Sequence, residues 1–375
     1  MDRFAHYGWP FFEPRHAILA REAEAWACAN LAHAHGEDGN PSFGTGADAI
    51  CKRLVQDLGC AGYLSHCVTE TPDVRSIAIL REVFAYHAGL ADFAFVMQGL
   101  GSGPIALAGS AALKERYLKE AANGHAIAAF ALSEPDAGSD VQAMTTSAKK
   151  QGDRWTLDGV KTWISNGGIA DFYVVFAKAE EGITAFVVDA AEVDASERIE
   201  IVAPHPMATV KLKGAKGILV GEPGQGFKLA MRNLDVFRTT VAAAALGFSR
   251  RALAESITRS RTREMFGQKL ADFQMTQAKL ADMATSIEAG ALLTYKSAWV
   301  KDRNQRVTRH AAMAKMFATE AAQQVIDDAV QICGGLGVMR GHPVEKLYRE
   351  VRALRIYEGA TEVQKMIIAR DLLKS

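Results

Sequence analysis

The stretch FALSEPDAGSD, residues 130–140, joins a short apolar run to a loop that contains Pro135 and Gly138. The run at 126–132 has the composition of a β-strand, and such a loop leaves backbone N–H groups and hydroxyls free to bind a planar polar ligand. An ordinary β-turn is the alternative interpretation. The stretch also marks a change in composition, because Ala- and Leu-rich sequence precedes it and β-branched and aromatic runs follow it.

The region before this stretch predicts helices, at 15–35, 47–58, 76–89 and 110–123. Ser110 is a suitable N-cap for the last of these helices, and Gly124 is a suitable C-cap. The region after it predicts short strands, at 126–132, 154–157, 160–164, 172–177, 183–188 and 199–202. Asp158-Gly159 favours a tight hairpin between two of them. Turn signals at such short spacing favour an antiparallel sheet or barrel.

Helical periodicity returns after residues 224–226 and continues to the end of the chain. The apolar residues of 268–302 recur three or four apart and predict one helix of about 50 Å. We therefore expect a mostly α protein with a central β domain. Its expected domains are an N-terminal helical domain at 1–125, a middle antiparallel β domain at 126–226 and a C-terminal helical bundle at 227–375.

Composition excludes several classes of protein. Of the 375 residues, 49% are hydrophobic and 23% are charged, as in ordinary globular chains. The 43 basic and 43 acidic residues balance, which argues against a nucleic-acid partner. No run approaches the roughly 18 apolar residues of a membrane span, and the first residues have no signal-peptide pattern. Five scattered cysteines predict free thiols in a cytoplasmic protein. No carboxylate or Cys cluster joins His33 and His35, so we expect no metal site.

Four further motifs follow in order. They are KTWISNG at 161–167, Arg263 with FG at 266–267, QICGG at 331–335 and YEGATE at 357–362. Together with FALSEPDAGSD, on a helix–sheet–helix layout, they resemble the acyl-CoA dehydrogenase family of flavoproteins. The resemblance implies a C-terminal four-helix bundle, bound FAD, an acyl-CoA substrate and an electron-transferring flavoprotein as the electron acceptor. It also implies a homotetramer in which FAD sites are shared between subunits.

The chemistry of that family requires a base for the α-proton of a thioester and a hydride acceptor beside the β-carbon. Because no side chain accepts hydride, a flavin must do so. The base must be a carboxylate in an apolar pocket, where loss of solvent raises its proton affinity. Glu358 matches the family position of that base, and the resemblance implies a trans-2-enoyl-CoA product. One subgroup places its base just before the CoA-binding arginine, where this chain has Phe237, which carries no proton.

The resemblance also implies the residues that bind FAD. The flavin ring would lie against Leu132, Ser133, Trp163 and Ser165, and Phe130 stands where the family often has tyrosine. The diphosphate and adenosine would be held from a neighbouring subunit by Arg263, Phe266, Gln274, Gln331, Gly334 and Gly335. Thr361 and Glu362 would lie near the adenosine, where Ala360 replaces a usual threonine.

For the substrate, the resemblance implies contacts from Ser139, Asp235, Arg238 and Gly359. Between Trp163 and Gly226 the chain is shorter than is usual for the family, and we expect 209–217 to be abbreviated. Two alternatives use the same residues differently. One is a flavin oxidase or monooxygenase that acts on a substrate without CoA, and the other is a flavin-free scaffold on the same fold.

Overall fold

The computed structural model describes residues 3–35, 45–152 and 154–374. The chain divides into two compact units, each assembled from separate stretches of sequence. Unit 1 comprises Met1–Asn40, Asp73–Asp92 and Asp235–Ser375, and unit 2 comprises Pro41–Pro72 and Phe93–Leu234. Each unit is described by itself below. The division into three consecutive domains stays a prediction.

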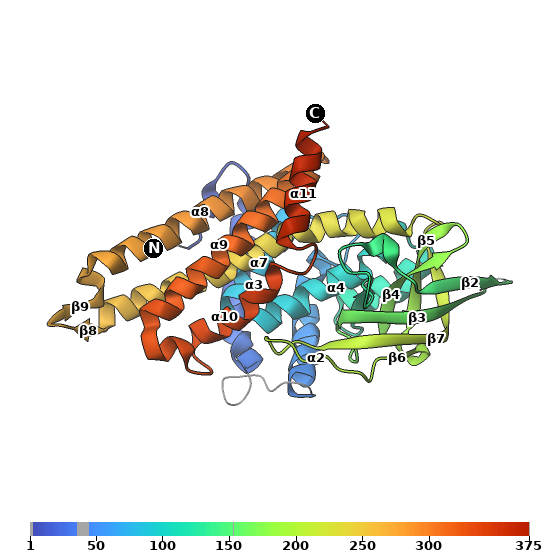
Figure 1. The fold of residues 1–375 in the computed structure, drawn as a ribbon, viewed down its shortest axis with the longest axis horizontal. Helices are drawn as coiled ribbons and strands as arrows, with labels where there is room; N and C mark the ends of the chain where they lie inside the picture. The colour runs from blue at the N-terminus through green and yellow to red at the C-terminus, as the bar shows by residue number, and fades with distance from the viewer. Residues whose placement is uncertain (1–2, 36–44, 153, 375) are drawn as a thin grey trace. The chain divides into compact units, whose positions relative to one another are not determined.

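Within the described residues of unit 2, seven strands form one sheet (Figure 1). They are β1 (Ala128–Ala131), β2 (Ser147–Gln151), β3 (Arg154–Ser165), β4 (Phe172–Ala179), β5 (Gly182–Asp189), β6 (Val193–Asp194) and β7 (Met207–Val220). The strand order is β1-β4-β2-β3-β7-β5, and β5 also pairs with β4, which closes five strands into a barrel. Most pairs are antiparallel, but β1 and β2 both run parallel to β4. The predicted central β domain is confirmed, with these parallel pairs added.

Two of the strand predictions are wrong. Asp158-Gly159 forms no hairpin, because β3 runs through it as one strand with a register shift between Leu157 and Gly159. Gly159 has φ 153°, and a Cβ there would lie 2.5 Å from Oγ1 of Thr146, so the strands approach too closely for any other residue. Residues 199–202 form no strand, since Pro204 and Pro206 follow and remove backbone donors. The stretch 209–217 lies inside the 14-residue strand β7, and its shortening relative to the family stays a prediction.

The helices of unit 2 include α2 (Thr45–Cys60), α5 (Ala111–Leu113) and α6 (Lys119–Ala122), and α4 (Gly89–Ala108) belongs to it from Phe93 onward. The predicted cap is confirmed, because the Ser110 hydroxyl accepts a hydrogen bond from the Leu113 N–H at 3.3 Å. A π-helical turn at Lys114–Leu118 interrupts the predicted 110–123 helix. Contrary to the sequence expectation, α4 is long and apolar enough to cross a membrane, yet 94% of its apolar window is buried inside the protein. That burial is typical of a core helix.

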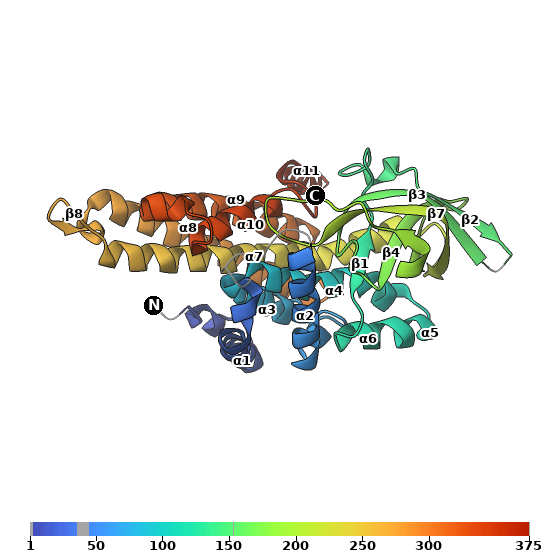
Figure 2. The ribbon, with the colours of Figure 1, turned by 90° about the horizontal axis from the view of Figure 1, so that it is seen from below.

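Unit 1 is helical. Its helices are α1 (Pro14–Asn30), α3 (Val74–His87), α8 (Gln274–Asp302), α9 (Thr308–Cys333), α10 (Pro343–Leu354), α11 (Thr361–Leu372) and α7 (Gly226–Thr262) from Asp235 onward. A small hairpin of β8 (Glu264–Met265) and β9 (Gln268–Lys269) joins α7 to α8. The predicted 268–302 helix therefore begins six residues late, at Gln274, because the hairpin uses the residues before it. Figure 2 shows α7 lying between α3 and the pair α8 and α9.

Short 3₁₀ turns connect many of these elements. They lie at Ala5–Gly8, Leu31–His35, Tyr63–His66, Val141–Ala143, Ala190–Glu192, Leu270–Asp272 and Gly334–Val338. The core of unit 1 is built on small residues of α7, from Val241 to Ala245, which share one buried cluster with Met283 and Ile287 of α8 and Val325 of α9. Small side chains let the helices approach closely and bury a continuous apolar surface.

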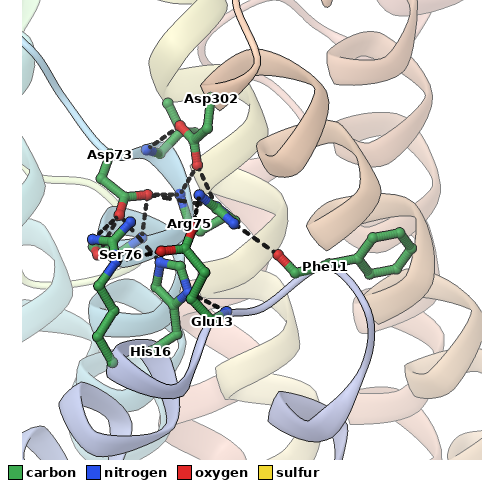
Figure 3. Close-up of polar contacts among 9 residues, drawn as sticks. Phe11, Glu13, His16, Asp73, Arg75, Ser76 and Asp302 are labelled. Atoms are coloured by element: carbon green, nitrogen blue, oxygen red, sulfur yellow. Dashed lines mark hydrogen bonds and ion pairs between the residues drawn. The ribbon is translucent and has the colours of Figure 1, made fainter.

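Arg75, at the start of α3, connects the N-terminal segment to the end of α8 (Figure 3). Its guanidinium donates to Oδ2 of Asp302 at 2.7 Å, to the Phe11 carbonyl at 2.9 Å and to Oε1 of Glu13 at 2.8 Å. Asp73 caps α3 by accepting from the N–H groups of Arg75 and Ser76. One arginine thus joins three separate parts of unit 1.

Candidate active site

Glu358 lies in the turn between α10 and α11. Its φ is 53°, and that of Gly359 is 92°, so two consecutive residues adopt the left-handed conformation. This conformation is ordinary for glycine but uncommon and strained for glutamate. A Cβ on residue 359 would also lie 2.5 Å from Nε2 of Gln364. The turn is therefore a special geometry that the surrounding structure must hold in place.

Side chains from three helices hold the two carbonyls of this turn. Arg238 of α7 donates from Nε to the Glu358 carbonyl at 3.1 Å, and Lys315 of α9 donates to the Gly359 carbonyl at 2.9 Å. Gln364 of α11 donates to both carbonyls, at 3.3 and 2.8 Å. Arg238, Lys315 and Gln364 are all buried. Their donors fix the backbone and leave the Glu358 side chain uncommitted.

The carboxylate of Glu358 is buried without a hydrogen-bond partner. The residue as a whole is partly exposed, but both oxygens are inaccessible and neither accepts a hydrogen bond from the described residues. Burial raises the pKa of Glu358, and the positive charges of Arg81, Arg238 and Lys315 oppose that rise. A carboxylate with raised proton affinity and free oxygens has the properties of a general base.

The predicted substrate residues Asp235 and Arg238 lie together at the start of the α7 segment of unit 1. Arg238 NH1 is 3.2 Å from Oδ1 of Asp235, and the Thr308 hydroxyl donates to Oδ2 at 3.3 Å. Phe237, between them in sequence, is buried. The structure thus brings Asp235, Arg238, Glu358 and Gly359 into one cluster, which the sequence motifs alone did not connect.

The residues expected beside the flavin ring meet in unit 2. The Thr162 N–H donates to the Ser133 carbonyl at 3.0 Å, which joins the loop after β1 to β3. Trp163 follows, at a register shift of β3, with φ 58° and an indole that is 58% exposed. Ser165 ends β3, and Phe130 lies in β1 with its ring 5.1 Å from that of Phe176.

Lys161 and Glu134 form a buried ion pair behind this surface that the motif analysis missed. Lys161 Nζ is 2.8 Å from Oε1 of Glu134 and donates to the Leu132 carbonyl at 3.1 Å. Burial favours the neutral form of Glu134, but hydrogen bonds from Lys161, Thr145 and Thr146 outweigh it and bring the pKa to about 2. Burial lowers the pKa of Lys161 to about 8. Lys161 and Glu134 both lie within the motifs quoted above, so membership of those motifs was the sequence signal from which the pair could have been found.

The other predicted cofactor residues lie on the surface of unit 1. Those that are exposed or in an exposed turn are Arg263, Phe266, Gln274, Gln331, Gly334, Gly335 and Glu362. Phe266 is 87% exposed. Thr361 differs, because it is buried and its hydroxyl donates to Glu320 at 2.6 Å. In unit 2, Ser139 is exposed in the loop that follows β1.

Arg263 and Glu358 belong to distant parts of unit 1. Arg238, which contacts Glu358, lies 24 residues before the end of α7 at Thr262, and that length of helix spans about 36 Å. Arg263 follows directly and precedes β8, which Figure 1 shows at the end of the α7–α8 pair. One chain therefore does not bring Arg263 and Phe266 to its own Glu358.

These residues fit a flavin. The exposed Trp163 side chain offers a face on which a planar ring can pack; Ser165 lies two residues further along β3, and the Ser133 carbonyl is bonded to the N–H of Thr162, the residue before Trp163. A Cβ added at Gly334 or Gly335 would meet nothing within 4 Å, so the backbone there is open to an approaching phosphate. The chemistry of the family also requires a base, and the Glu358 carboxylate, which no described residue engages, is the candidate for it.

None of the five cysteines, all of which lie within the described residues, forms a disulfide, as predicted. The structure also places Glu24, Cys28 and His87 with ligand atoms within 4.8 Å of one another. A guanidinium already occupies this cluster, because Arg3 pairs with Glu24. His33 lies in the 3₁₀ turn that follows α1, and the side chain of His35 lies outside the described residues.

Comparison with known proteins places the chain in a family. Residues 129–216 match the family model for the middle domain of acyl-CoA dehydrogenase, and residues 224–373 match the model for its C-terminal domain. The chain is 40% identical to a 3-(aryl)acrylate reductase of Clostridium sporogenes over 72% of its own length and 75% of the relative's. It is 39% identical to the mouse short-chain specific acyl-CoA dehydrogenase, over 75% and 71%. It is 38% identical to subunit CarC of the caffeyl-CoA reductase–Etf complex of Acetobacterium woodii, over 80% and 83%.

Solved structures agree. The butyryl-CoA dehydrogenase of Megasphaera elsdenii is 32% identical and superimposes with a TM-score of 0.87 over 96% of this chain and 99% of that one. An acyl-CoA dehydrogenase of Bacillus anthracis complexed with FAD is 27% identical, with a TM-score of 0.88 over 97% of this chain and 67% of that one. The chain belongs to the acyl-CoA dehydrogenase family, and it is an FAD-dependent oxidoreductase that acts on acyl-CoA.

Proposed function

We propose that this protein desaturates an acyl-CoA thioester between Cα and Cβ to a trans-2-enoyl-CoA, with Glu358 as the base for the α-proton. The observation that carries the proposal is the Glu358 carboxylate, whose two oxygens are buried and accept no hydrogen bond within the part of the chain that the structure describes. An oxygen that no protein group engages is available to the substrate. Its raised pKa means that the proton, once taken, is held.

The surrounding residues perform the other tasks of the reaction. Arg238, Lys315 and Gln364 hold the Glu358–Gly359 backbone, so the carboxylate keeps its position while the proton moves. The backbone N–H of Glu358 binds the thioester oxygen and stabilises the negative charge that develops there. FAD, when bound, supplies the hydride acceptor that no side chain provides. Asp235, Arg238, Gly359 and Ser139 bind the CoA portion of the substrate.

FAD is held by two copies of the chain in this proposal. Leu132, Ser133, Trp163 and Ser165 hold the ring, with Phe130 beside them. The diphosphate and adenosine are bound by a neighbouring subunit through Arg263, Phe266, Gln274, Gln331, Gly334 and Gly335, with Thr361 and Glu362 near the adenosine. The length of α7 between Arg238 and Arg263 supports the second copy. We therefore propose at least a dimer, and a homotetramer as the full assembly.

The electrons pass to an electron-transferring flavoprotein, which we propose as the partner of this cytoplasmic enzyme. A relative's name places it in a reductase–Etf complex, and this supports the assignment. Two relatives are named as reductases, so the direction of the reaction in the cell depends on the electron donor or acceptor. Transfer from the reduced protein to a purified electron-transferring flavoprotein tests the partner.

The test of the function is anaerobic reduction of the bound flavin by a panel of straight, branched, alicyclic and aromatic acyl-CoAs. We expect at least one thioester to bleach the flavin, and Glu358→Gln to slow the bleaching by orders of magnitude while FAD stays bound. Bleaching by none of them, or normal bleaching in the variant, contradicts the proposal.

The alternative is an oxidase or monooxygenase reaction on a substrate without CoA. One similar solved structure, 26% identical, is that of the prolyl acyl carrier protein oxidase AnaB, and this similarity supports the alternative. Rapid peroxide formation in air with such a substrate would support it. Purified protein that is colourless and takes up no FAD would support the flavin-free scaffold instead.

A further inference from the structure

Arg81 and Asp92 form a second buried ion pair in unit 1. Arg81 of α3 donates from Nε to Oδ1 of Asp92 and from NH2 to Oδ2, both at 2.8 Å. Asp92 lies near the start of α4, and the exposed fractions of the two residues are 1% and 4%. The two parallel hydrogen bonds fix the orientation of the guanidinium plane.

A chain of contacts leads from this pair to the turn that carries Glu358. Arg81 NH1 donates to the Thr240 hydroxyl at 3.1 Å, and that hydroxyl donates to the Phe237 carbonyl at 2.9 Å. The next residue, Arg238, holds the Glu358 carbonyl. The guanidinium of Arg81 is thus fixed against the segment of α7 that positions the base.

Arg81 also acts on the Glu358 carboxylate through its charge. Among the positive groups that lower the pKa of Glu358 against the effect of burial, Arg81 acts more strongly than Arg238 or Lys315. Asp92 acts in the opposite direction. Since none of the described residues donates a hydrogen bond to the ionised carboxylate, these charges decide how readily it loses its proton.

Asp92 has a further effect, because it occupies Nε and one N–H of NH2 of Arg81. A guanidinium free to turn toward Glu358 would form a direct ion pair with it and remove its basicity. Burying an ion pair is expensive, and well-packed apolar residues often replace one without loss of stability. A buried pair that is bonded to the segment of α7 holding Glu358, and whose charges act on its carboxylate, therefore indicates a role beyond packing.

We propose that Arg81 and Asp92 are positioning residues for the reaction: Arg81 supplies the charge that keeps Glu358 ready to ionise, and Asp92 prevents that charge from binding Glu358 directly. This inference rests on the proposed role of Glu358 as the base. The charged groups whose fields act on Glu358 are Arg81 of α3, Asp92 of α4, Arg238 of α7 and Lys315 of α9, and the adjacent Tyr357 is a further titratable group that interacts with it.

The test compares Arg81→Gln with Asp92→Asn in the FAD-loaded protein. Infrared spectroscopy follows the protonated-carboxyl band that Glu358→Gln removes, as a function of pH and without substrate. We expect the apparent pKa of Glu358 to rise by about one pH unit in Arg81→Gln and to fall by about as much in Asp92→Asn. The pH profile of flavin reduction by an acyl-CoA should shift in the same two directions.

Shifts of opposite sign distinguish this role from a structural one, which would damage both variants alike. Arg250→Met is the matched control, because Arg250 pairs with Glu82, the neighbour of Arg81 on α3, with Nε 2.7 Å from Oε1. It should lower the unfolding temperature and leave the Glu358 band in place.

A double variant, Arg81→Met with Asp92→Leu, keeps the test decisive if a single variant fails to fold. Removing both charges should leave the apparent pKa between those of the two single variants. Equal apparent pKa values in all variants, or shifts of the same sign, overturn the proposal. The infrared titration does not use turnover, so a failure of Glu358 as the catalytic base shows in the flavin assay alone.

Discussion

Arg238 contacts the backbone of Glu358 rather than its carboxylate, with Nε 3.1 Å from the carbonyl oxygen. The Arg238 guanidinium therefore fixes the backbone of Glu358 and does not neutralise its carboxylate through a direct ion pair. Lys315 likewise donates to a backbone carbonyl, that of the next residue, Gly359. Two positive side chains thus position the turn and lower the cost of ionising Glu358, while neither occupies the oxygens that must take a proton.

Glu358→Gln should stabilise the folded protein at alkaline pH. Burial raises the folded-state pKa of Glu358 above its unfolded value, so the stability that its protonated form contributes is lost as pH rises through the folded pKa. The variant has no such loss. We expect its unfolding temperature to exceed that of the wild type by a margin that grows as pH rises above the unfolded-state pKa of glutamate. A constant margin above that pKa would contradict the buried-carboxylate assignment.

Gly359→Ala should slow flavin reduction by about tenfold or more without abolishing FAD binding. Residue 359 has φ 92°, and the added Cβ would lie 2.5 Å from Nε2 of Gln364, so the turn must shift and carry Glu358 with it. Stopped-flow reduction by an acyl-CoA measures the effect. Gly8→Ala is the control, because a Cβ there meets nothing within 4 Å and its φ is not positive. Equal rates in the two variants would show that the turn tolerates the change.

Inactive variants in different chains should complement each other. Glu358→Gln and Arg263→Ala abolish or weaken activity separately, but a mixed assembly contains sites that combine an intact Glu358 from one chain with an intact Arg263 from the other. We expect co-expressed, differently tagged chains to recover up to about half of the wild-type activity, because one of the two sites in each mixed pair is intact. The reference is an assembly in which one chain carries both substitutions and its partner chain carries neither. No recovery in the mixed assembly argues against shared FAD sites.

Lys161→Met should destabilise unit 2 and weaken FAD retention. The substitution leaves Glu134 buried without its cation and removes the hydrogen bond to the Leu132 carbonyl. Breaking one side of a buried pair costs about 3–5 kcal/mol. Chemical denaturation measures the loss, and flavin fluorescence measures cofactor release. Lys216→Met, which breaks an exposed pair with Glu192, should change neither quantity by much.

Asp302→Asn should change the pH dependence of stability in the cluster of Figure 3. Burial and the neighbouring Asp73 raise the pKa of Asp302 to about 6, above the ordinary range for an aspartate. Its contribution to stability is therefore present below about pH 4 and lost as pH rises through about 6. The wild type should lose stability relative to the variant over that window, as thermal unfolding at several pH values would show. The opposite trend would mean that Arg75 compensates the second charge fully.

Local sequence predicted the elements that short-range chemistry determines. The Ser110 cap, the helices around α2 and α3, and strands β4 and β5 follow from capping groups and from runs of β-branched and aromatic residues. The predictions that failed depended on distant partners. Asp158-Gly159 has the composition of a hairpin turn, but β7 pairs with β3 on both sides of it and keeps the strand continuous. Likewise β8 and β9 pair with each other and delay the start of α8.

For the site, the order of motifs determined the family, the cofactor and the candidate base, because each motif is a local run of residues. The sequence by itself did not identify Lys315, Gln364, Arg81 or Asp92, which come from helices far apart along the chain. A lysine among the apolar residues of 311–318 was a signal, but the Gly359 carbonyl becomes its partner only when α9 packs beside the turn before α11. Tertiary structure alone decided which cations fix the backbone of Glu358 and that its oxygens stay unpartnered, since burial and distance are properties of packing and not of composition.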